Sequence, residues 1–410
     1  MKRRVVITGT GAVTSLGTGA DALWQGVKNG KCGINRIERV DVSDMPTKCG
    51  AEVKEFDPSP WIDKKELRRM DRFAQFALAA ACMAADSAKL DTKSETPERV
   101  GVVISSGIGG IETLISQHLI LLEKGPAKIS PFFVPMMISN MAAAQVAIRF
   151  NAKGFSESVS TACASSTNAI GDAFRVIQND DADVIFAGGA EAPLTRLTLA
   201  GFCANRTMSV NEDPMKACRP FDKDRDGFLL GEGAAVLILE EYEHAVARGA
   251  TILAELVGYG CTNDAFHITA PAENGEGGAR CMALALKEAG ITGDQVDYVN
   301  AHGTSTGLND PNETKAIKTV FGEHAWKLAI SSSKSMHGHA LAAAGAIEAI
   351  VTTHAVAEGF APPTINYCTP DPECDLDYVP NVGRELNIRH AISNSFGFGG
   401  HNATLVFKKI

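Results

Sequence analysis

A cysteine within a run of small residues is the first candidate for chemistry in this chain. Cys163 lies in VSTACASSTNAIGDAF, after which apolar residues recur at three- and four-residue steps, a pattern that predicts a helix with one apolar face. Ser160 or Thr161 is placed to cap that helix, so Cys163 would fall in its first turn. The positive end of a helix stabilises a thiolate, and small neighbours leave room for a substrate. A buried structural thiol is the usual alternative for a cysteine, so a nucleophile is favoured here only once distant partner residues are found.

Two histidines lie in glycine-flanked turns that follow predicted strands. His302 is in NAHGTST and His339 is in KSMHGH, where Lys334 precedes His339 by five positions. In α/β proteins, reactive groups gather at such strand ends. Zinc ligation is disfavoured, because His337 and His339 are only two positions apart and no closely spaced thiolate accompanies them. A cysteine with distant histidines is typical of covalent acyl transfer.

Two further motifs invite functional interpretations that their spacing does not support. The segment GTGAVTSLG after a predicted strand has Thr14 where a dinucleotide-binding loop needs its third glycine, so we expect a tight strand-to-helix turn there. The segment 222–232, DKDRDGFLLGE, begins like a calcium-binding EF-hand loop. However, Gly233 occupies the position of the essential glutamate and Glu232 is one residue early. We interpret it as a polar loop.

Composition describes an ordinary globular chain. Of its 410 residues, 45% are hydrophobic and 21% are charged. No run approaches the roughly 20 apolar residues of a membrane span, and no signal peptide is expected at the start. The ten cysteines are scattered without a CxxC pair, which predicts a reducing, cytoplasmic setting.

The charge distribution suggests an acidic partner rather than nucleic acid. A formal net charge of -9 argues against a general nucleic-acid binder. Within 61–73, WIDKKELRRMDRF, the spacing of Lys65, Arg68, Arg69 and Arg72 predicts one basic helix face. Such a face is either solvated or a docking site for an acidic protein.

Strands and helices alternate throughout, and the pattern restarts near Ala250. Strands are predicted at 3–8, 99–105 and 251–259, and a strand at 328–333 precedes a small-residue helix just as a strand precedes the Cys163 helix. This order predicts an α/β fold with mostly parallel sheets, divided into residues 1–250 with the cysteine and 251–410 with the histidines.

Four motifs, in order and at this spacing, resemble one family. They are TACASS around Cys163, NAHGTST around His302, KSMHGH at 334–339 and NSFGFGG at 394–400. The chain is similar over its whole length to the β-ketoacyl-acyl-carrier-protein synthases of the Cys-His-His type, nearest the elongating type II fatty-acid enzymes (KAS II). The resemblance implies a thiolase-like, five-layered αβαβα fold of two related halves, a homodimer and a decarboxylative Claisen condensation of acyl and malonyl groups.

The resemblance also assigns roles to residues of this chain. Cys163 would carry the acyl group, His302 and His339 would stabilise the enolate, and the backbone of Phe398 would complete an oxyanion hole and gate the site. Lys334 and Glu348 would form a supporting ion pair. Ile108 and Phe202 would line the acyl pocket, and Thr304 and Thr306 would bind the phosphopantetheine arm. Four cations would meet an acidic acyl carrier protein: Lys65, Arg69, Lys128 and Arg206. No metal or cofactor is implied beyond the arm of the carrier protein.

Departures from the family pattern leave alternatives open. Histidine replaces the usual threonine at His337 and His401, and Pro311 and Asn312 separate the acidic pair Asp310 and Glu313. These changes leave open a ketosynthase of a polyketide or other specialised pathway. A non-catalytic chain-length factor would lose the nucleophile that is present here. A thiolase would need a second cysteine near the segment GFGGH, which has none.

Overall fold

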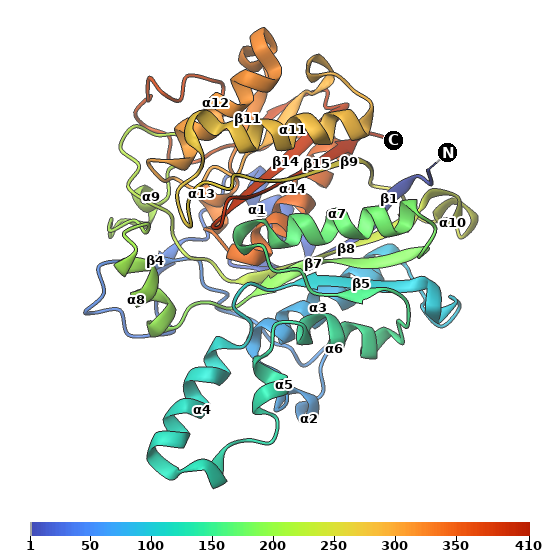
Figure 1. The fold of residues 1–410 in the computed structure, drawn as a ribbon, viewed down its shortest axis with the longest axis vertical. Coiled ribbons are helices and arrows are strands. Elements are labelled where there is room, and N and C mark those ends of the chain that lie inside the picture. The colour runs from blue at the N-terminus through green and yellow to red at the C-terminus, as the bar shows by residue number, and fades with distance from the viewer. Residues whose placement is uncertain (1) are drawn as a thin grey trace.

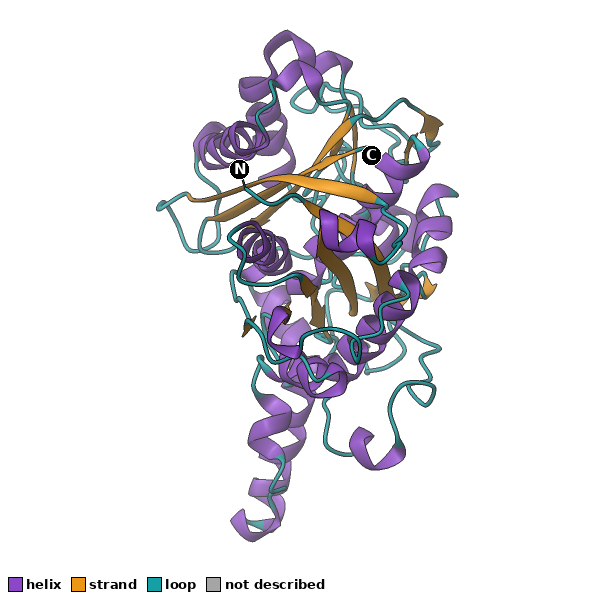
Figure 2. Ribbon diagram, turned by 90° about the vertical axis from the view of Figure 1, so that its right-hand side faces the viewer, coloured by secondary structure: helices purple, strands orange, loops and turns teal. Residues whose placement is uncertain are grey.

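The structure, a computed structural model, describes residues 2–410 and is built around one 11-stranded mixed sheet (Figures 1 and 2). The first half of the chain contributes β1 (Val5–Thr14), β2 (Gly17–Thr18), β5 (Val100–Ser105), β6 (Ser156–Glu157), β7 (Val184–Glu191) and β8 (Gly233–Glu241). The second half contributes β9 (Ala254–Asn263), β10 (Tyr298–Asn300), β11 (Ala329–Ser331), β14 (His390–Gly397) and β15 (His401–Lys408). Two small hairpins complete the strands: β3 (Asn35–Arg36) with β4 (Cys49–Gly50), and β12 (Phe360–Ala361) with β13 (Arg384–Glu385).

The two halves of the sheet have the same strand order. The first runs β6-β5-β7-β8-β1 and the second runs β11-β10-β14-β15-β9, which are equivalent positions in the sequence order of each half. They join where Val5–Ile7 of β1 pairs antiparallel with residues 254–256 of β9. The expectation of two related halves is therefore confirmed by the topology.

The sheet is less parallel than expected. Parallel pairs occur only at its two ends, between β10, β11 and β14 and between β5, β6 and β7. The central pairs are antiparallel, including β14 with β15. The connection from β14 to β15 spans only residues 398–400, and so short a turn allows only an antiparallel neighbour.

The two halves of the sheet form two layers and helices form the other three, and Figure 1 shows the five layers stacked from top to bottom. One outer layer contains α11 (Glu276–Ala289) and α12 (Asn309–Phe321), the central layer contains α1 (Ala20–Lys28), α7 (Ser165–Gln178) and α14 (Ala344–Glu358), and the other outer layer contains α3 (Arg72–Ala88) and α6 (Met141–Phe150). Peripheral helices are α2 (Lys64–Leu67), α4 (Ile111–Lys124), α5 (Phe133–Met137), α8 (Arg196–Ala204), α9 (Pro214–Ala217) and α10 (Tyr242–Ala247). The short helix α13 (Lys334–His337) is fully buried. The five layers expected of a thiolase-like fold are thus present.

The first two glycines of GTGAVTSLG serve packing inside β1, and the tight turn expected before the helix lies later in the segment, at residues 15–16. Gly11 lies inside β1, where a β-carbon would collide with the carbonyl oxygen of Ala80 on α3. Gly260 of β9 has the same relation to Cys281 on α11. In each half, a glycine in the first strand therefore lets the outer helix lie directly on the sheet.

The central helix is apolar enough to be mistaken for a membrane span. The segment Leu341–Glu358 is long and apolar enough to cross a bilayer, which differs from the expectation that the chain has no such run. In the folded chain, 83% of this segment is buried between the two halves of the sheet. Its composition reflects that position, because a helix covered on all sides carries no polar face.

The basic stretch 61–73 does not form the single helix that its spacing predicted. The helix α2 covers only four of its residues, and Asp71 then accepts a hydrogen bond from Phe73 as the N-cap of α3. Arg72 turns inward and pairs with the buried Glu232 at 2.8 Å, whereas Lys65, Arg68 and Arg69 remain exposed. The predicted face therefore keeps three of its four cations at the surface, and Lys64 beside them is exposed as well.

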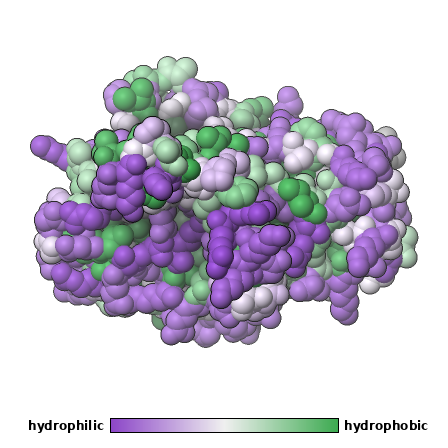
Figure 3. Space-filling model, turned by 90° about the horizontal axis from the view of Figure 1, so that it is seen from below, coloured by the Kyte–Doolittle hydropathy of each residue, from purple (hydrophilic) through white to green (hydrophobic). Residues whose placement is uncertain are grey.

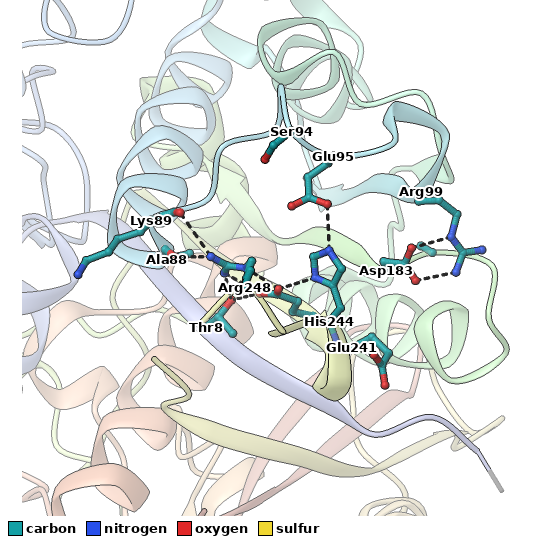
Figure 4. A network of polar contacts seen from close by, with 12 residues as sticks. Thr8, Ala88, Lys89, Ser94, Glu95, Arg99, Asp183, Glu241, His244 and Arg248 are labelled. Carbon is teal, nitrogen blue, oxygen red and sulfur yellow. Dashed lines mark hydrogen bonds and ion pairs between the residues drawn. The ribbon is translucent and has the colours of Figure 1, made fainter. Parts of the chain in front are cut away.

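A buried polar network ties the end of α3 to β8 and α10 (Figure 4). Glu240 accepts hydrogen bonds from Thr8, His244 and Arg248, and Arg248 also donates to the carbonyl oxygen of Ala88 at 2.9 Å. The bond to Glu240 raises the pKa of His244 to about 9, and Glu95 adds to this effect. At neutral pH His244 is therefore a cation that bridges two carboxylates.

Candidate active site

Both halves of the chain line one cavity of about 610 Å³. Its walls include nine residues that the sequence singled out: Ile108, Cys163, Phe202, Arg206, His302, Thr304, Thr306, His339 and Phe398. The structure therefore brings the cysteine and both histidines to one space, although the cysteine is more than 130 positions from either histidine in the chain. Lys334 and Glu348 lie behind the wall, and Lys65, Arg69 and Lys128 lie on the surface.

The cysteine sits on a strained turn between β6 and α7. A 3-10 turn, η3 (Ala162–Ala164), leads into the helix, and Ala162 has a φ of 51°. A left-handed alanine costs roughly 1–3 kcal/mol, which the surrounding packing must offset. The expected capping by Ser160 or Thr161 is wrong, because neither side chain caps the helix; Ser165 instead accepts a hydrogen bond from the Thr161 N–H at 2.8 Å.

The second half repeats this turn without its nucleophile. Before α14 lies the 3-10 turn η7 (Leu341–Ala343), in which Leu341 has a φ of 48°. Leu341 corresponds to Ala162 in this arrangement, and Ala342 corresponds to Cys163. Both turns face the cavity. The duplicated architecture thus offers two equivalent positions, of which one carries a sulfur.

Burial outweighs the helix terminus in setting the state of the thiol. Cys163 keeps some exposure along the cavity wall, but its surroundings are enclosed, and this desolvation raises the pKa of its thiol to about 12. The charge of Lys334 and the backbone N–H groups of Phe398 and Cys163 oppose the rise. The expectation of a resting thiolate is therefore wrong, and the sulfur must lose its proton when it attacks.

The two histidines face each other as neutral imidazoles. The ring centroids of His302 and His339 are 5.4 Å apart with an interplanar angle of 84°, and each residue is 3% exposed. Burial lowers both pKa values well below 6.5, and the charge of Lys334 lowers them further. Because neither ring is protonated at neutral pH, each carries one N–H that it can donate.

Lys334 fixes the tautomer of His302. Its Nζ donates to the His302 carbonyl oxygen at 2.7 Å and lies 3.4 Å from His302 Nδ1. An ammonium group can only donate, so Nδ1 is the acceptor and the proton resides on Nε2. Glu348 of α14 pairs with the same Nζ, and burial raises the pKa of Glu348 to about 7. This ion pair is 1% exposed on the lysine side and fully buried on the glutamate side.

Sequence reasoning missed the carboxylate that holds the His302 turn. Glu313 of α12 accepts hydrogen bonds from the His302 and Gly303 N–H groups, both at 2.8 Å, and Asn394 donates to it at 3.3 Å. The sequence did show that an acidic pair is retained here. It gave no sign that Glu313 is buried or that its partners are backbone groups of a turn ten residues earlier.

The glycine-rich turn after β14 closes over the cysteine. A β-carbon on Gly397 would lie 2.7 Å from the Thr161 carbonyl oxygen and 3.1 Å from the Cys163 nitrogen, so only glycine allows this approach. Phe398 follows at the cavity wall and is half-buried. The backbone of this turn thus lies directly beside the nucleophile.

The two unusual histidines do not line the cavity. His401 begins β15, with its ring beside Gly399. His337 is 2% exposed, and its Nε2 lies 2.9 Å from Ser333 Oγ. Burial, together with the charge of Lys334, lowers the pKa of His337 to about 3.

The four candidate docking cations are all exposed. Arg206 lines the mouth of the cavity, and Lys65 lies on α2. The Arg69 guanidinium packs on the ring of Phe132 at 4.6 Å, which joins α2 to the projecting arm of α4 and α5 that Figure 1 shows below the body. Lys128 lies in η2 (Pro126–Lys128) of the same arm.

Comparison with known proteins places these features in one family. The family described as "Beta-ketoacyl synthase, N-terminal domain" matches residues 2–245, and "Beta-ketoacyl synthase, C-terminal domain" matches residues 253–368. The chain is 53% identical over 409 residues to "3-oxoacyl-[acyl-carrier-protein] synthase 2" of Synechocystis sp., covering 100% of this chain and 98% of the relative. The protein of the same name from Staphylococcus aureus is 53% identical over 407 residues, with 99% and 98% covered.

Solved structures agree with the fold. A β-ketoacyl synthase from Burkholderia phymatum superimposes with a TM-score of 0.92 at 38% identity, and the ishigamide ketosynthase/chain length factor with 0.94 at 36%. A ketosynthase of a type II polyketide system, solved in complex with its acyl carrier protein and bound to the hexaketide, gives 0.91 at 38%. Each comparison covers 100% of both chains.

Replacing His337 with threonine should reduce the loss in the free energy of unfolding that occurs as the pH falls below neutral. The folded pKa of about 3 lies below the unfolded value of 6.5, so between these pH values the unfolded chain binds a proton that the folded chain excludes. Stability from this residue is complete above pH 6.5 and falls as the pH drops. Between pH 7 and pH 5, the free energy of unfolding measured with urea should fall by about 2 kcal/mol less in His337→Thr than in the wild type.

The matched control is the exposed His267→Thr, which should keep the wild-type pH dependence. Parallel curves for wild type and His337→Thr would show that His337 is protonated in the folded protein.

Proposed function

Because this chain belongs to the β-ketoacyl synthase family, we propose that it is a 3-oxoacyl-acyl-carrier-protein synthase that elongates acyl chains by two carbons in fatty-acid synthesis. The observation that carries this proposal is the convergence of Cys163 with two neutral imidazoles in one cavity. The enzyme is a condensing acyltransferase, as are the relatives to which it is similar along its full length.

The first half-reaction moves the acyl group to sulfur. Cys163 attacks the thioester carbonyl of an acyl carrier protein, the Cys163 thiol loses its proton, and the phosphopantetheine thiol leaves with a proton. The backbone N–H groups of Cys163 and Phe398 are placed to donate to the oxyanion, since both already stabilise negative charge at the sulfur. Thr304 and Thr306, 3.0 Å apart at the cavity wall, are placed to hold the pantetheine arm.

The second half-reaction uses the histidines. The malonyl thioester loses CO2, and the electrons of the broken C–C bond move to the thioester oxygen as an enolate. The N–H groups of His302 and His339 donate to that oxygen. Because both rings are neutral, they can do so without repelling the nearby Lys334. The enolate carbon then attacks the acyl carbonyl, the bond to Cys163 Sγ breaks, and the sulfur takes up a proton. No resident cofactor enters this sequence, because the substrates bring their own activation as thioesters.

An acyl carrier protein is the proposed partner. A similar ketosynthase has been solved in complex with such a protein. The exposed cations Lys65, Arg69, Lys128 and Arg206 would meet its acidic surface, with Arg206 at the entrance to the cavity. We place the reaction in the cytoplasm, a setting in keeping with ten cysteines that all remain unpaired.

A polyketide ketosynthase is the second candidate, because it would use the same chemistry. It is favoured by the likeness to a ketosynthase of a type II polyketide system and to the ishigamide ketosynthase/chain length factor. Their identity of 36% and 38% is well below the 53% shared with 3-oxoacyl-[acyl-carrier-protein] synthase 2. The two candidate functions are distinguished by measuring condensation rates with saturated acyl chains of graded length and with polyketide intermediates, each attached to a carrier protein.

Removing either histidine should separate acylation from decarboxylation. Loss of one preorganised donor costs about 3 kcal/mol of barrier, so His302→Ala and His339→Ala should release CO2 from malonyl carrier protein about a hundredfold more slowly. Both should still form the Cys163 thioester, detected by mass spectrometry of the intact protein. Cys163→Ala should form no acyl adduct. A retained adduct in Cys163→Ala, or normal CO2 release in both histidine variants, contradicts these roles.

Reversing the charge of the basic cluster should weaken carrier binding. The double variant Lys65→Glu and Arg69→Glu should lose affinity for an acyl carrier protein by about tenfold at low salt, with a smaller loss at high salt, because screening weakens surface electrostatics. Titration calorimetry at two ionic strengths measures both effects. Lys327→Glu, an exposed cation on another face of the chain, serves as the control. Equal affinity for the double variant and the wild type would leave this cluster as a solvated face.

A homodimer is proposed through the projecting arm. The arm exposes apolar side chains, among them Leu119 at 50%, Leu122 at 69% and Val134 at 54%. The arm projects toward the face seen in Figure 3, where apolar residues (green) lie among the polar ones. Exposed apolar patches of this kind mark interfaces between proteins.

Two acidic substitutions on the arm should yield a monomer. Leu122→Glu with Val134→Glu would place charges in a desolvated interface, which is costly without partners. Sedimentation velocity should give the wild type twice the 43.3 kDa mass of one chain and the double variant a single mass. A monomeric wild type, or a variant that still forms dimers, argues against this surface.

A further inference from the structure

A buried carboxylate at the cavity wall has no role in the reaction described above. Glu191 ends β7 and is fully buried, yet it lines the same cavity as Cys163. It accepts hydrogen bonds from the N–H groups of Gly107 and Ile108, at 2.9 and 3.1 Å, and from Ser106 Oγ at 3.0 Å. Three donors from three successive residues converge on one carboxylate, which fixes the loop after β5.

That loop carries an apolar side chain into the cavity. Ile108 belongs to one apolar cluster with Cys163, Phe202 and Leu341. Apart from the bonds to Glu191, the Gly109 N–H donates to Ser106 Oγ within the loop at 3.0 Å, and the Gly110 N–H donates to the carbonyl oxygen of Met137 in the arm at 2.9 Å. Glu191 is therefore the anchor on the cavity side.

Glu191 also reaches the twin turn of the second half. The N–H of Ala342 is among the donors that oppose the rise in the pKa of Glu191 caused by burial. A β-carbon on Gly107 would lie 3.0 Å from Glu191 Oε2 and 3.4 Å from the Ala342 β-carbon. One carboxylate thus holds together the two walls that carry Ile108 and Leu341.

We propose that Glu191 is a positioning residue for acyl-chain length: it holds Ile108 at the cavity wall and so limits how far the chain bound to Cys163 extends. This inference rests on the proposed function. Glutamine at this position presents an NH2 group to donors that need an acceptor, so at least one bond is lost and the loop is released on the cavity side. Longer chains should then gain relative to shorter ones.

The test compares two substrates in four proteins. The kcat/KM for tetradecanoyl carrier protein, divided by that for hexanoyl carrier protein, should rise about tenfold in Glu191→Gln. In the Ile108→Ala background the same substitution should leave the ratio unchanged, because the side chain through which Glu191 acts is gone. Glu52→Gln is the matched control: Glu52 is 6% exposed, accepts backbone N–H bonds from Glu38 and Arg39, and does not line the cavity.

A weaker variant covers the case in which Glu191→Gln does not fold. Ser106→Ala removes one of the three donors and should raise the ratio in the same direction by a smaller factor. The inference is overturned by an unchanged ratio in both variants, by an equal loss of activity on both substrates, or by the same rise in the Ile108→Ala background. A wild type that condenses no acyl chain at all would instead refute the proposed function.

Discussion

The buried charge of Lys334 is the interaction on which the rest of the active site depends. Its ammonium group is 1% exposed, so it persists only because Glu348 and the His302 carbonyl oxygen supply acceptors. From this position it keeps both catalytic imidazoles neutral, sets the tautomer of His302 and opposes the rise in the pKa of Cys163. One cation thus acts on two imidazoles and a thiol at once, and its burial requires the central layer of helices.

Burial acts on the nucleophile and the histidines in the same sense. Enclosure favours the uncharged form of every group, so the thiol stays protonated and the imidazoles stay neutral. For the histidines this is the state that the reaction needs. For Cys163 it means that the thiolate forms only as it attacks, when the backbone N–H groups of Phe398 and Cys163 stabilise the negative charge. A resting thiol is also less open to oxidation than a thiolate.

The sequence predicts the residues that are marked by their immediate neighbours in the chain. It does not reveal the residues whose role depends on contacts with distant segments. Cys163, His302 and His339 could be found because small residues and glycines mark their turns at the ends of strands. Glu313 and Glu191 could not be assigned, because a carboxylate that binds backbone N–H groups is recognisable only once the turn and the carboxylate lie together. Arg72 was misplaced for a related reason: helical spacing put it on an exposed face, but Asp71 starts a new helix and Glu232 draws Arg72 inward.

The duplicated fold explains why the chemistry needs both halves. The turns before α7 and α14 have the same strained backbone, but one carries Cys163 and the other carries Ala342. The half without the nucleophile supplies His302 from the end of β10 and His339 from the segment after α13. In the proposed reaction, each half alone would present either the cysteine that accepts the acyl group or the histidines that stabilise the enolate, but not both. Because β1 pairs with β9, the two sheets are held in fixed register, and the separation between sulfur and imidazoles is set by backbone hydrogen bonds rather than by a flexible interface.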